Sequence, residues 1–454
     1  MEPQELTIEA ASAKLAQGQL SAVELVSSCL DRIEGLNADL NAFIHLRSRK
    51  ELLEEAQLAD KRRQAGQRLG PLDGIPIGLK ANYAYAGLPT TAGSKILAEW
   101  RPKKDAVAVA NLRRAGAVIL GMLNMHEFAD GPTNENPHYG RALNPHDMSR
   151  MPGGSSGGSA VALATNMCLG ATGSDTGGSI RIPSALCGTV GLKPTYGLVS
   201  VEGVVPFSRS LDHAGPMART PHDALLLLRG MTGDGDVAGR PSTAIGERDQ
   251  IVVGVERDYF GRYLQSGVRR AFDNAIDSLR KIGYQIREIH LDHVPRAGAA
   301  ELAILFPEAA AVHHHFLNTR IQDYGRDVRL SLLSGRLYRA VDYVNAQELR
   351  GNLRSDLDAV FEQATIVATP TTVLEAPTWD TEFIQTDEGE VELLEALIRC
   401  TAPFNLTGHP AMSVPCGVGD EGLPVGLQLV GPALSEALLA DLATAFLSAN
   451  LNAE

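Results

Sequence analysis

Two short segments concentrate serine and glycine in a pattern that could activate a nucleophile. The first reads Pro-Gly-Gly-Ser-Ser-Gly-Gly-Ser at 152–159, and the second reads Gly-Ser-Asp-Thr-Gly-Gly-Ser-Ile-Arg-Ile-Pro at 173–183. Glycine at this density weakens a helix or strand because it costs backbone entropy. We therefore expect a positional use, in which glycine admits unusual dihedral angles or brings main-chain N–H groups close to a ligand. Hydroxyls beside free N–H groups suit nucleophilic attack and oxyanion stabilisation.

Each segment has an alternative use. The run from Thr176 to Ser179 could surround an oxyanion with N–H groups, with Ser179 as the attacking residue. A phosphate site is the competing use, but no phosphate-loop or dinucleotide fingerprint follows a strand here. Residues 154–158 match the G-x-S-x-G elbow of α/β-hydrolases, which requires a strand directly before it. Met-Pro-Gly at 151–153 is not a strand, so we do not favour the elbow.

Lysine and histidine supply the candidate bases. Lys80 ends the apolar run 75–79, so it is either a lysine that reaches solvent or a partly buried amine. Burial lowers a lysine pKa, and the neutral amine can then act as a base. Three consecutive histidines at 313–315 would point in three directions on a helix and cannot share one ion. We expect them to form a solvated or interface patch.

Composition limits the possible partners and compartments. The 454 residues carry a net charge of −13, from 41 basic and 54 acidic side chains, which argues against a nucleic-acid surface. The 5 cysteines are scattered without C-x-x-C spacing, so neither a disulfide framework nor a zinc site is indicated. We expect no metal and no cofactor. The N-terminus lacks a secretory signal and no apolar run spans a membrane, so we expect a cytoplasmic protein.

Strand and helix patterns alternate along the chain, which is typical of an α/β fold. Residues 5–65 look helical, with a capping box at Ser21–Glu24, and 124–144 reads as a loop. A polar stretch at 232–249 is expected to be a surface connection. Buried strands are predicted at 75–79, 117–121, 251–255, 284–291, 365–369, 411–415 and 425–430. Further helices are predicted at 106–115, 268–282, 299–324, 333–363 and 435–448.

Taken together, the motifs resemble those of the amidase signature family. Besides the two serine–glycine segments, the matching stretches are 74–80, 89–94, 187–195, 404–411 and 422–429. The resemblance covers nearly the whole chain. It implies one α/β domain over 1–454 with a large mixed β-sheet sandwiched by helices. Within that domain it implies N-terminal helices at 1–66, a catalytic core at 67–230, a variable substrate-shaping region at 231–400, and C-terminal strands and a helix at 401–454.

The resemblance also implies a Ser–cis-Ser–Lys triad. Matching motif to motif, Ser179 is the nucleophile, Ser155 the bridging serine after a cis peptide bond, and Lys80 the base. The family's oxyanion hole corresponds to the backbone N–H groups of Thr176, Gly177, Gly178 and Ser179. With this resemblance, we expect Lys80 to be buried and neutral. Ser155 would relay the proton and return it to the leaving nitrogen, as amide cleavage requires.

Two departures from the family pattern concern the substrate. Ala81 stands where many members carry aspartate, a feature of arylacetamide-type hydrolases. The family's pocket-lining stretch is 124–133 here, so Ala129, Asp130 and Gly131 are predicted to bind substrate. Asp130 stands where an apolar residue is common. If it lines the pocket it favours a hydrogen-bond donor or a cation; the alternative is that it faces solvent.

The predicted function is hydrolysis of a small amide, aryl amide or carbamate through a serine acyl-enzyme, with release of ammonia or an amine. The alternative is the A subunit of a glutamine-dependent tRNA amidotransferase, which needs partner subunits and holds glutamine with an arginine and an aspartate. The matching stretches, 328–335 and 397–403, contain Arg329 and Arg399 but no Asp or Glu. A non-enzymatic binding module would show a broken triad. We expect a small-molecule substrate, no nucleic acid, no membrane, and a homodimer as an open possibility.

Overall fold

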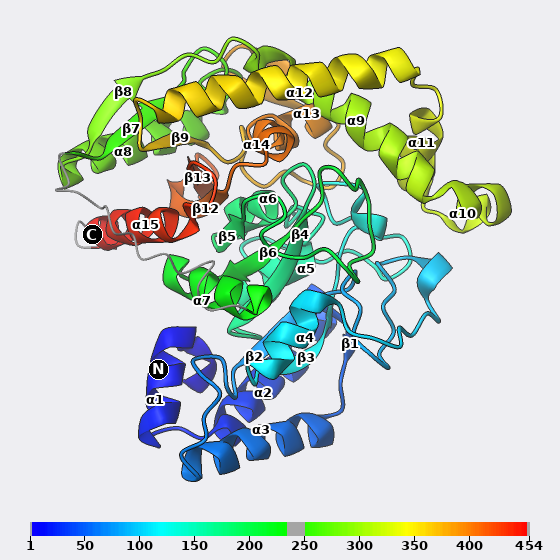
Figure 1. Ribbon diagram of the computed structural model, residues 1–454, viewed down its shortest axis with the longest axis vertical. Helices are drawn as coiled ribbons and strands as arrows, with labels where there is room; N and C mark the ends of the chain where they lie inside the picture. The colour runs from blue at the N-terminus through cyan, green and yellow to red at the C-terminus, as the bar shows by residue number, and fades with distance from the viewer. Residues whose placement is uncertain (1, 234–249, 452–454) are drawn as a thin grey trace.

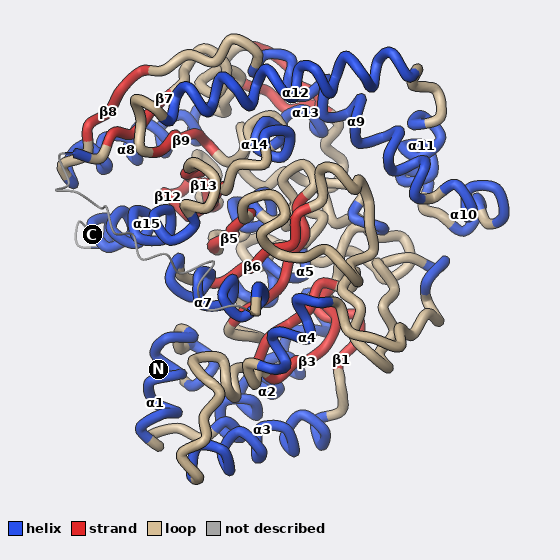
Figure 2. The backbone as a smooth tube through the Cα atoms, viewed as in Figure 1, coloured by secondary structure: helices blue, strands red, loops and turns tan. Residues whose placement is uncertain are grey.

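A mixed sheet of eleven strands runs through the computed structural model, which describes residues 2–233 and 250–451 (Figure 1). The strand order is β1-β3-β2-β4-β6-β5-β12-β13-β9-β7-β8, and helices flank the sheet (Figure 2). The predicted α/β class with a large mixed sheet is thereby confirmed. Most of the expected surface connection, 234–249, lies outside the described residues. No helix among the described residues is long and apolar enough to cross a membrane.

The strands of the large sheet are short and mostly buried. They are β1 Phe43–Leu46, β2 Pro76–Lys80, β3 Val118–Leu123, β4 Gly170–Asp175, β5 Val190–Lys193, β6 His213–Ala218, β7 Val252–Val255, β8 Gln285–Glu288, β9 Ile366–Pro370, β12 Ala411–Val418 and β13 Pro424–Val430. A separate hairpin pairs β10 Phe383–Thr386 with β11 Gly389–Glu392. All seven predicted strands are present with shifted ends, whereas β1, β4, β5, β6 and the hairpin were not predicted.

The helices fall into three groups along the chain. The first comprises α1 Ile8–Gln17, α2 Ala22–Leu40, α3 Arg49–Gln64, α4 Val107–Arg114, α5 Gly157–Ala164, α6 Arg181–Leu186 and α7 Pro221–Thr232. The second comprises α8 Ser266–Ile282, α9 Ala297–Val312, α10 His314–Thr319, α11 Arg326–Gly335 and α12 Ala340–Phe361. The last comprises α13 Leu393–Ile398, α14 Ala402–Thr407 and α15 Glu436–Leu451. In Figure 1, α9, α11 and α12 lie at the opposite end of the molecule from α1–α3.

Local chemistry sets several of these boundaries. The capping box predicted at Ser21–Glu24 opens α2, with Ser21 accepting a hydrogen bond from the Glu24 N–H. Three helical predictions were too long. Strand β1 interrupts 5–65, and the pattern 299–324 is divided between α9 and α10. The pattern 333–363 contains a break between α11 and α12. Helix α11 ends at Gly335, where an added Cβ would lie 2.1 Å from the Phe306 carbonyl oxygen on α9, so close backbone contact fixes that position.

The missed strand β4 has the sequence Gly-Ala-Thr-Gly-Ser-Asp, which propensity alone does not favour as a strand. Its glycines serve packing instead. An added Cβ on Gly173 would lie 2.7 Å from the Ile180 side chain and 2.9 Å from Met217 Sδ. The strand forms because its neighbours on both sides pair with it, parallel to β2 and antiparallel to β6.

This pairing positions the site. Strands β2 and β4 are parallel neighbours, so their carboxyl ends meet at the same edge of the sheet. Strand β2 ends at Lys80 and β4 ends at Asp175, inside the second serine–glycine segment and directly before its residues 176–179. Residues separated by about a hundred positions are thereby brought to one place.

Candidate active site

Lys80 is fully buried at the end of β2 and contacts two serines. Its Nζ donates hydrogen bonds to Ser155 Oγ at 2.7 Å and to Ser174 Oγ at 2.9 Å. Burial lowers the pKa of Lys80 to about 7, against the opposing attraction of Asp175 and Asp212. The amine can therefore be neutral near physiological pH, as a general base must be. The interpretation of Lys80 as a lysine that reaches solvent is wrong.

Ser155 precedes α5 in a tightly packed turn. The Gly154–Ser155 peptide bond is cis, as the family resemblance implies. The Ser155 carbonyl accepts a hydrogen bond of 3.1 Å from the His126 N–H. An added Cβ on Gly158 would lie 2.5 Å from both the backbone nitrogen and the carbonyl oxygen of Asn124. Glycine here permits close backbone contact, which is the positional use expected from the sequence. No strand lies directly before Ser155, which excludes the α/β-hydrolase elbow.

Ser179 lies in the loop between β4 and α6 and lines a cavity. Its side chain is the least buried of the predicted triad, with 8% of the residue exposed. The described part of the chain holds no hydrogen bond between Ser155 Oγ and Ser179 Oγ. Catalytic hydrogen bonds often tighten only when substrate binds. The structure therefore joins Lys80 to Ser155 directly and places Ser179 at the adjoining cavity.

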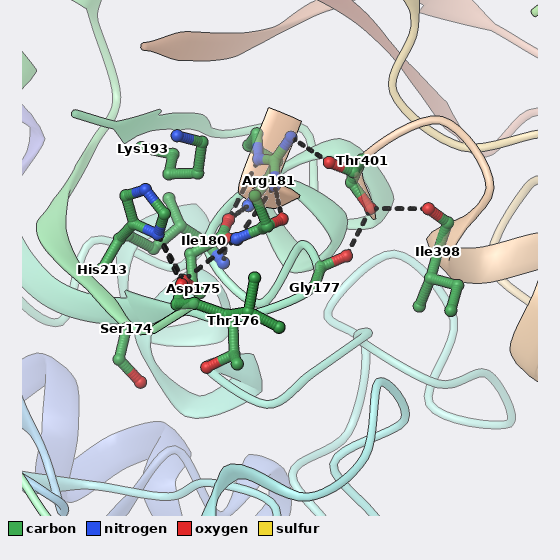
Figure 3. Close-up of polar contacts among 12 residues, drawn as sticks. Ser174, Asp175, Thr176, Gly177, Ile180, Arg181, Lys193, His213, Ile398 and Thr401 are labelled. Atoms are coloured by element: carbon green, nitrogen blue, oxygen red, sulfur yellow. Dashed lines mark hydrogen bonds and ion pairs between the residues drawn. The ribbon is translucent and has the colours of Figure 1, made fainter. Parts of the chain in front are cut away.

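The loop that carries the predicted oxyanion hole has free donors. Within the described part of the chain, the N–H groups of Gly177, Gly178 and Ser179 donate to no protein acceptor. Gly178 has φ +136°, and an added Cβ there would lie 2.3 Å from Thr401 Oγ1. Thr401 Oγ1 donates a 2.6 Å hydrogen bond to the Gly177 carbonyl, as Figure 3 shows. The loop backbone is thus held while its donors remain available.

A buried ion pair braces the same loop. Arg181 and Asp175 are both completely buried, with Nη2 of Arg181 2.9 Å from Oδ1 of Asp175 (Figure 3). Burial alone would raise the pKa of Asp175, but the guanidinium of Arg181 holds it well below its ordinary value. Asp175 also accepts a hydrogen bond of 3.1 Å from the Ile180 N–H. Neither side chain lines the cavity, so the pair supports the loop from behind it.

The cavity beside Ser179 has a volume of about 310 Å³. The predicted residues Ala129, Asp130 and Gly131 all line it, together with Thr176 and Gly177. Its ionisable lining side chains are His126, Asp130, Glu135, Glu301 and Asp327. Its apolar lining includes Ile182, Phe207, Leu302, Leu305, Phe306, Leu394 and Ile398. Of the described residues that line it, four carry carboxyl groups and none is lysine or arginine.

Two acidic side chains of the cavity, Asp130 and Asp327, have pKa values shifted in opposite directions. Burial raises the pKa of Asp130 to about 7, while Ser331 and His126 oppose the shift, and Oδ2 has no hydrogen-bond partner. Partial burial would also raise the pKa of Asp327, but its contacts with His126, including a 2.8 Å hydrogen bond to Nε2, and backbone N–H groups together hold the pKa below its ordinary value. Asp130 lines the cavity, with its Oδ2 buried there.

Two polar residues at the site were not predicted. Ser174 lies two residues after Thr172, whose Oγ1 accepts the Lys80 N–H at 2.9 Å, so both point to the same face of β4. The two-residue spacing of Thr172 and Ser174 was a sequence signal that could have identified Ser174. Glu301 lies on α9 in an otherwise apolar run, 0% exposed, and burial raises its pKa well above its ordinary value. Helix α9 carries a second acid, Glu308, so the sequence did not distinguish the one that reaches the cavity.

Other candidate residues lie elsewhere. His313 is buried, not solvated, and its Nδ1 lies 2.9 Å from the Tyr324 hydroxyl. Neither Arg329 nor Arg399 lines the cavity beside Ser179. Arg329 bonds to Gln322, whereas the Arg399 guanidinium lies 4.0 Å from the centre of the Tyr259 ring.

The chain is similar to known proteins over almost its whole length. A family model described as Amidase matches residues 24–440. The A subunit of the glutamyl-tRNA(Gln) amidotransferase of Chloroflexus aggregans is 41% identical, covering 96% of this chain and 94% of its own. A crystal structure of an amidase superposes with a TM-score of 0.91 at 35% identity, over 98% of this chain and 100% of that one. The crystal structure of the A subunit of the Thermotoga maritima glutamyl-tRNA(Gln) amidotransferase superposes with a TM-score of 0.78 at 31% identity, over 98% of this chain and 95% of that one.

The fold and the family match define an enzyme of the class that hydrolyses carbon–nitrogen bonds. The chain belongs to the amidase family, and the resemblance to the amidase signature family seen in its motifs is confirmed.

Proposed function

We propose that this chain hydrolyses the amide bond of a small substrate that carries no carboxylate. The observation that carries the proposal is the set of ionisable groups in the cavity beside Ser179, which has four carboxyl groups and no lysine or arginine among its described lining residues. A buried carboxylate needs a cation or several N–H donors to replace its water. This lining instead suits neutral amides and groups that donate hydrogen bonds.

The reaction would use Ser179 as nucleophile, Ser155 as proton relay and Lys80 as base. As Ser179 Oγ attacks the carbonyl carbon, its proton passes to Ser155, and the Ser155 proton passes to the neutral Lys80 amine. The N–H groups of Gly177, Gly178 and Ser179 stabilise the oxyanion. The relay then runs backwards and protonates the leaving nitrogen, which breaks the carbon–nitrogen bond. Water hydrolyses the acyl-enzyme by the same relay and regenerates Ser179.

A second candidate is the A subunit of a glutamine-dependent tRNA amidotransferase. The curated relatives favour it over the first, since the similar sequences bear that name at up to 41% identity. Under this candidate a tRNA-bound substrate and partner subunits would take part, contrary to the expectation of no nucleic acid. Asp327, directly before the stretch 328–335, lines the cavity and offers a carboxylate for the α-amino group of glutamine. Among the described residues that line the cavity, none is a lysine or arginine that could pair with the glutamine carboxylate.

One panel separates the two candidates. The purified chain is assayed for product release from aliphatic amides, aryl amides, anilides, carbamates and glutamine, with Ser179→Ala as the inactive control. Turnover of neutral amides with little ammonia from glutamine supports the first candidate. Preferential ammonia release from glutamine, increased by adding the partner subunits of an amidotransferase, establishes the second and overturns the first. Unchanged turnover in Ser179→Ala would reject the nucleophile.

A further inference from the structure

Glu301 is the one acidic residue lining the described part of the cavity whose two carboxyl oxygens are both buried and both without a hydrogen-bond partner. Both Oε1 and Oε2 are buried and have no hydrogen-bond partner among the described residues. The residue is 0% exposed, yet it lines the cavity beside Ser179. By contrast, Asp327 bonds to His126 and Glu135 bonds to Arg141. A buried polar group without partners is expensive, so its presence in a cavity points to a ligand.

The position of Glu301 relates it to the reaction centre. An added Cβ on Gly177 would lie 2.7 Å from Glu301 Oε1, so the carboxyl group lies against the loop with the candidate oxyanion donors. The charged groups that act on it are Arg181 and Asp175, and the Arg181 guanidinium is already paired with Asp175. Because burial raises the pKa of Glu301 well above its ordinary value, the neutral acid is favoured there. A neutral carboxylic acid has one donor and one acceptor side by side.

We propose that Glu301 selects substrates that carry a second amide-type group, such as a carboxamide, urea or carbamate, close to the scissile bond. This proposal rests on the proposed hydrolysis of small amides. The Glu301 O–H would donate to the carbonyl oxygen of that group, and an N–H of the group would donate to the other Glu301 oxygen. A ketone offers only the acceptor and leaves one Glu301 oxygen unsatisfied. A carboxylate lacks the N–H and adds a charge that the cavity does not neutralise.

The test measures binding without turnover. In a Ser179→Ala background, calorimetry compares succinamide with 4-oxopentanamide, succinamate and 4-aminobutanamide, which differ only at the end away from one shared carboxamide. We expect succinamide to bind about tenfold more tightly than 4-oxopentanamide, which corresponds to one lost hydrogen bond. Adding Glu301→Leu should reduce the preference for succinamide over 4-oxopentanamide to about twofold or less. The same substitution should weaken the binding of 4-aminobutanamide by no more than about threefold, because a neutral Glu301 forms no ion pair with an ammonium group.

Controls keep the result specific. Glu301→Gln retains a donor and an acceptor and should bind succinamide within about threefold of the parent protein. Glu348→Gln removes an exposed carboxyl group from α12, outside the cavity, and should leave all four affinities unchanged. Thermal unfolding checks that each variant folds. Equal affinities for succinamide and 4-oxopentanamide, absence of binding by both, or a selective loss of 4-aminobutanamide in Glu301→Leu would each overturn the proposal. Failure of the proposed hydrolysis would appear separately, as succinamide binding without turnover by the unmutated chain.

Discussion

The amine of Lys80 experiences two opposing effects. Complete burial disfavours its protonated form, while the carboxyl groups of Asp175 and Asp212 favour it. Burial is the larger effect and brings the pKa to about 7, near the pH at which a general base is most useful. Two hydroxyls, of Ser155 and Ser174, receive its N–H groups and fix its direction. The lysine is therefore oriented toward Ser155, the proposed relay, in the absence of a substrate.

The pH dependence of turnover follows from this pKa. If neutral Lys80 is the base, kcat/KM should be low in acid, rise through an apparent pKa of about 7, and level off above it. Initial rates between pH 5.5 and 9 on the best amide of the panel would measure the profile. A rate that is flat across this range, or that falls as pH rises through 7, would contradict the assignment.

Substitution of the base gives a second check. Lys80→Arg keeps a cation that stays protonated at all working pH values, so proton transfer through Ser155 should stop. We expect kcat to fall by about 10²–10⁴-fold. The matched control is Lys50→Arg, since Lys50 is an exposed lysine on α3. Near-normal rates in Lys80→Arg, with the control unaffected, would reject Lys80 as the base.

The loop between β4 and α6 carries the proposed nucleophile and the proposed oxyanion donors. Its glycines have different functions, since Gly178 adopts a left-handed φ of +136° and Gly177 lies against Glu301. Thr401, from the start of α14, holds the Gly177 carbonyl. The loop is thus fixed from three directions: by its own strand, by α9 and by the segment before α14.

Gly178→Ala should disturb this loop. The new Cβ would meet Thr401 Oγ1 at 2.3 Å, and alanine disfavours the left-handed φ, so the N–H groups would move away from the oxyanion position. Loss of an oxyanion donor typically lowers kcat by about 10²–10³-fold. Gly298→Ala on α9 is the control, because nothing lies within 4 Å of its added Cβ. Steady-state kinetics should show the loss in kcat for Gly178→Ala alone. Equal kinetics for the two variants would refute the role of Gly178 in positioning the oxyanion donors.

Thr401→Val removes a hydroxyl while nearly keeping the shape of the side chain. The Gly177 carbonyl would lose its 2.6 Å hydrogen bond, and an unsatisfied buried acceptor costs about 1–3 kcal/mol. We expect a lower free energy of unfolding by that amount in urea titrations, together with a smaller kcat. Thr401→Ser keeps the hydroxyl and should retain most of the free energy of unfolding and most of kcat. If valine and serine behave alike, the hydroxyl does not hold the loop.

How much was predictable differs between the elements. Ser155, Ser179 and the loop glycines are contiguous in sequence motifs, so their grouping was visible without a structure. Helix α8 and the apolar strands were also predictable because their hydrophobic patterns are regular. Strand β4 was not, because its small residues form a strand only through pairing with β2 and β6. Glu301 was missed because its place in the cavity depends on how α9 packs, which no local pattern encodes.

At the scale of the whole molecule, Arg181 connects the two halves of the chain. Its guanidinium donates to the Thr401 carbonyl at 2.9 Å, to Gln428 Oε1 at 2.7 Å and to Asn405 Oδ1 at 2.6 Å. These partners lie in or beside α14 and β13, more than two hundred residues along the chain. The ion pair that braces the catalytic loop therefore also joins the N-terminal and C-terminal parts of the sheet.

Asp175→Asn should accordingly destabilise the entire fold. The substitution leaves the Arg181 charge buried without a counter-charge, and such losses cost about 3–5 kcal/mol. The exposed pair Asp31–Arg49 is the control, since Asp31→Asn should cost about 0–1 kcal/mol.

The pKa of Asp175 is lower in the folded chain than in the unfolded chain. Its stabilising contribution is therefore complete above pH ~4 and is lost as the pH falls below that value. Urea unfolding at pH 7 and at pH 3.5 should show the difference between Asp175→Asn and the unmutated chain shrinking in acid; a difference that stays constant or grows would contradict the ion-pair explanation.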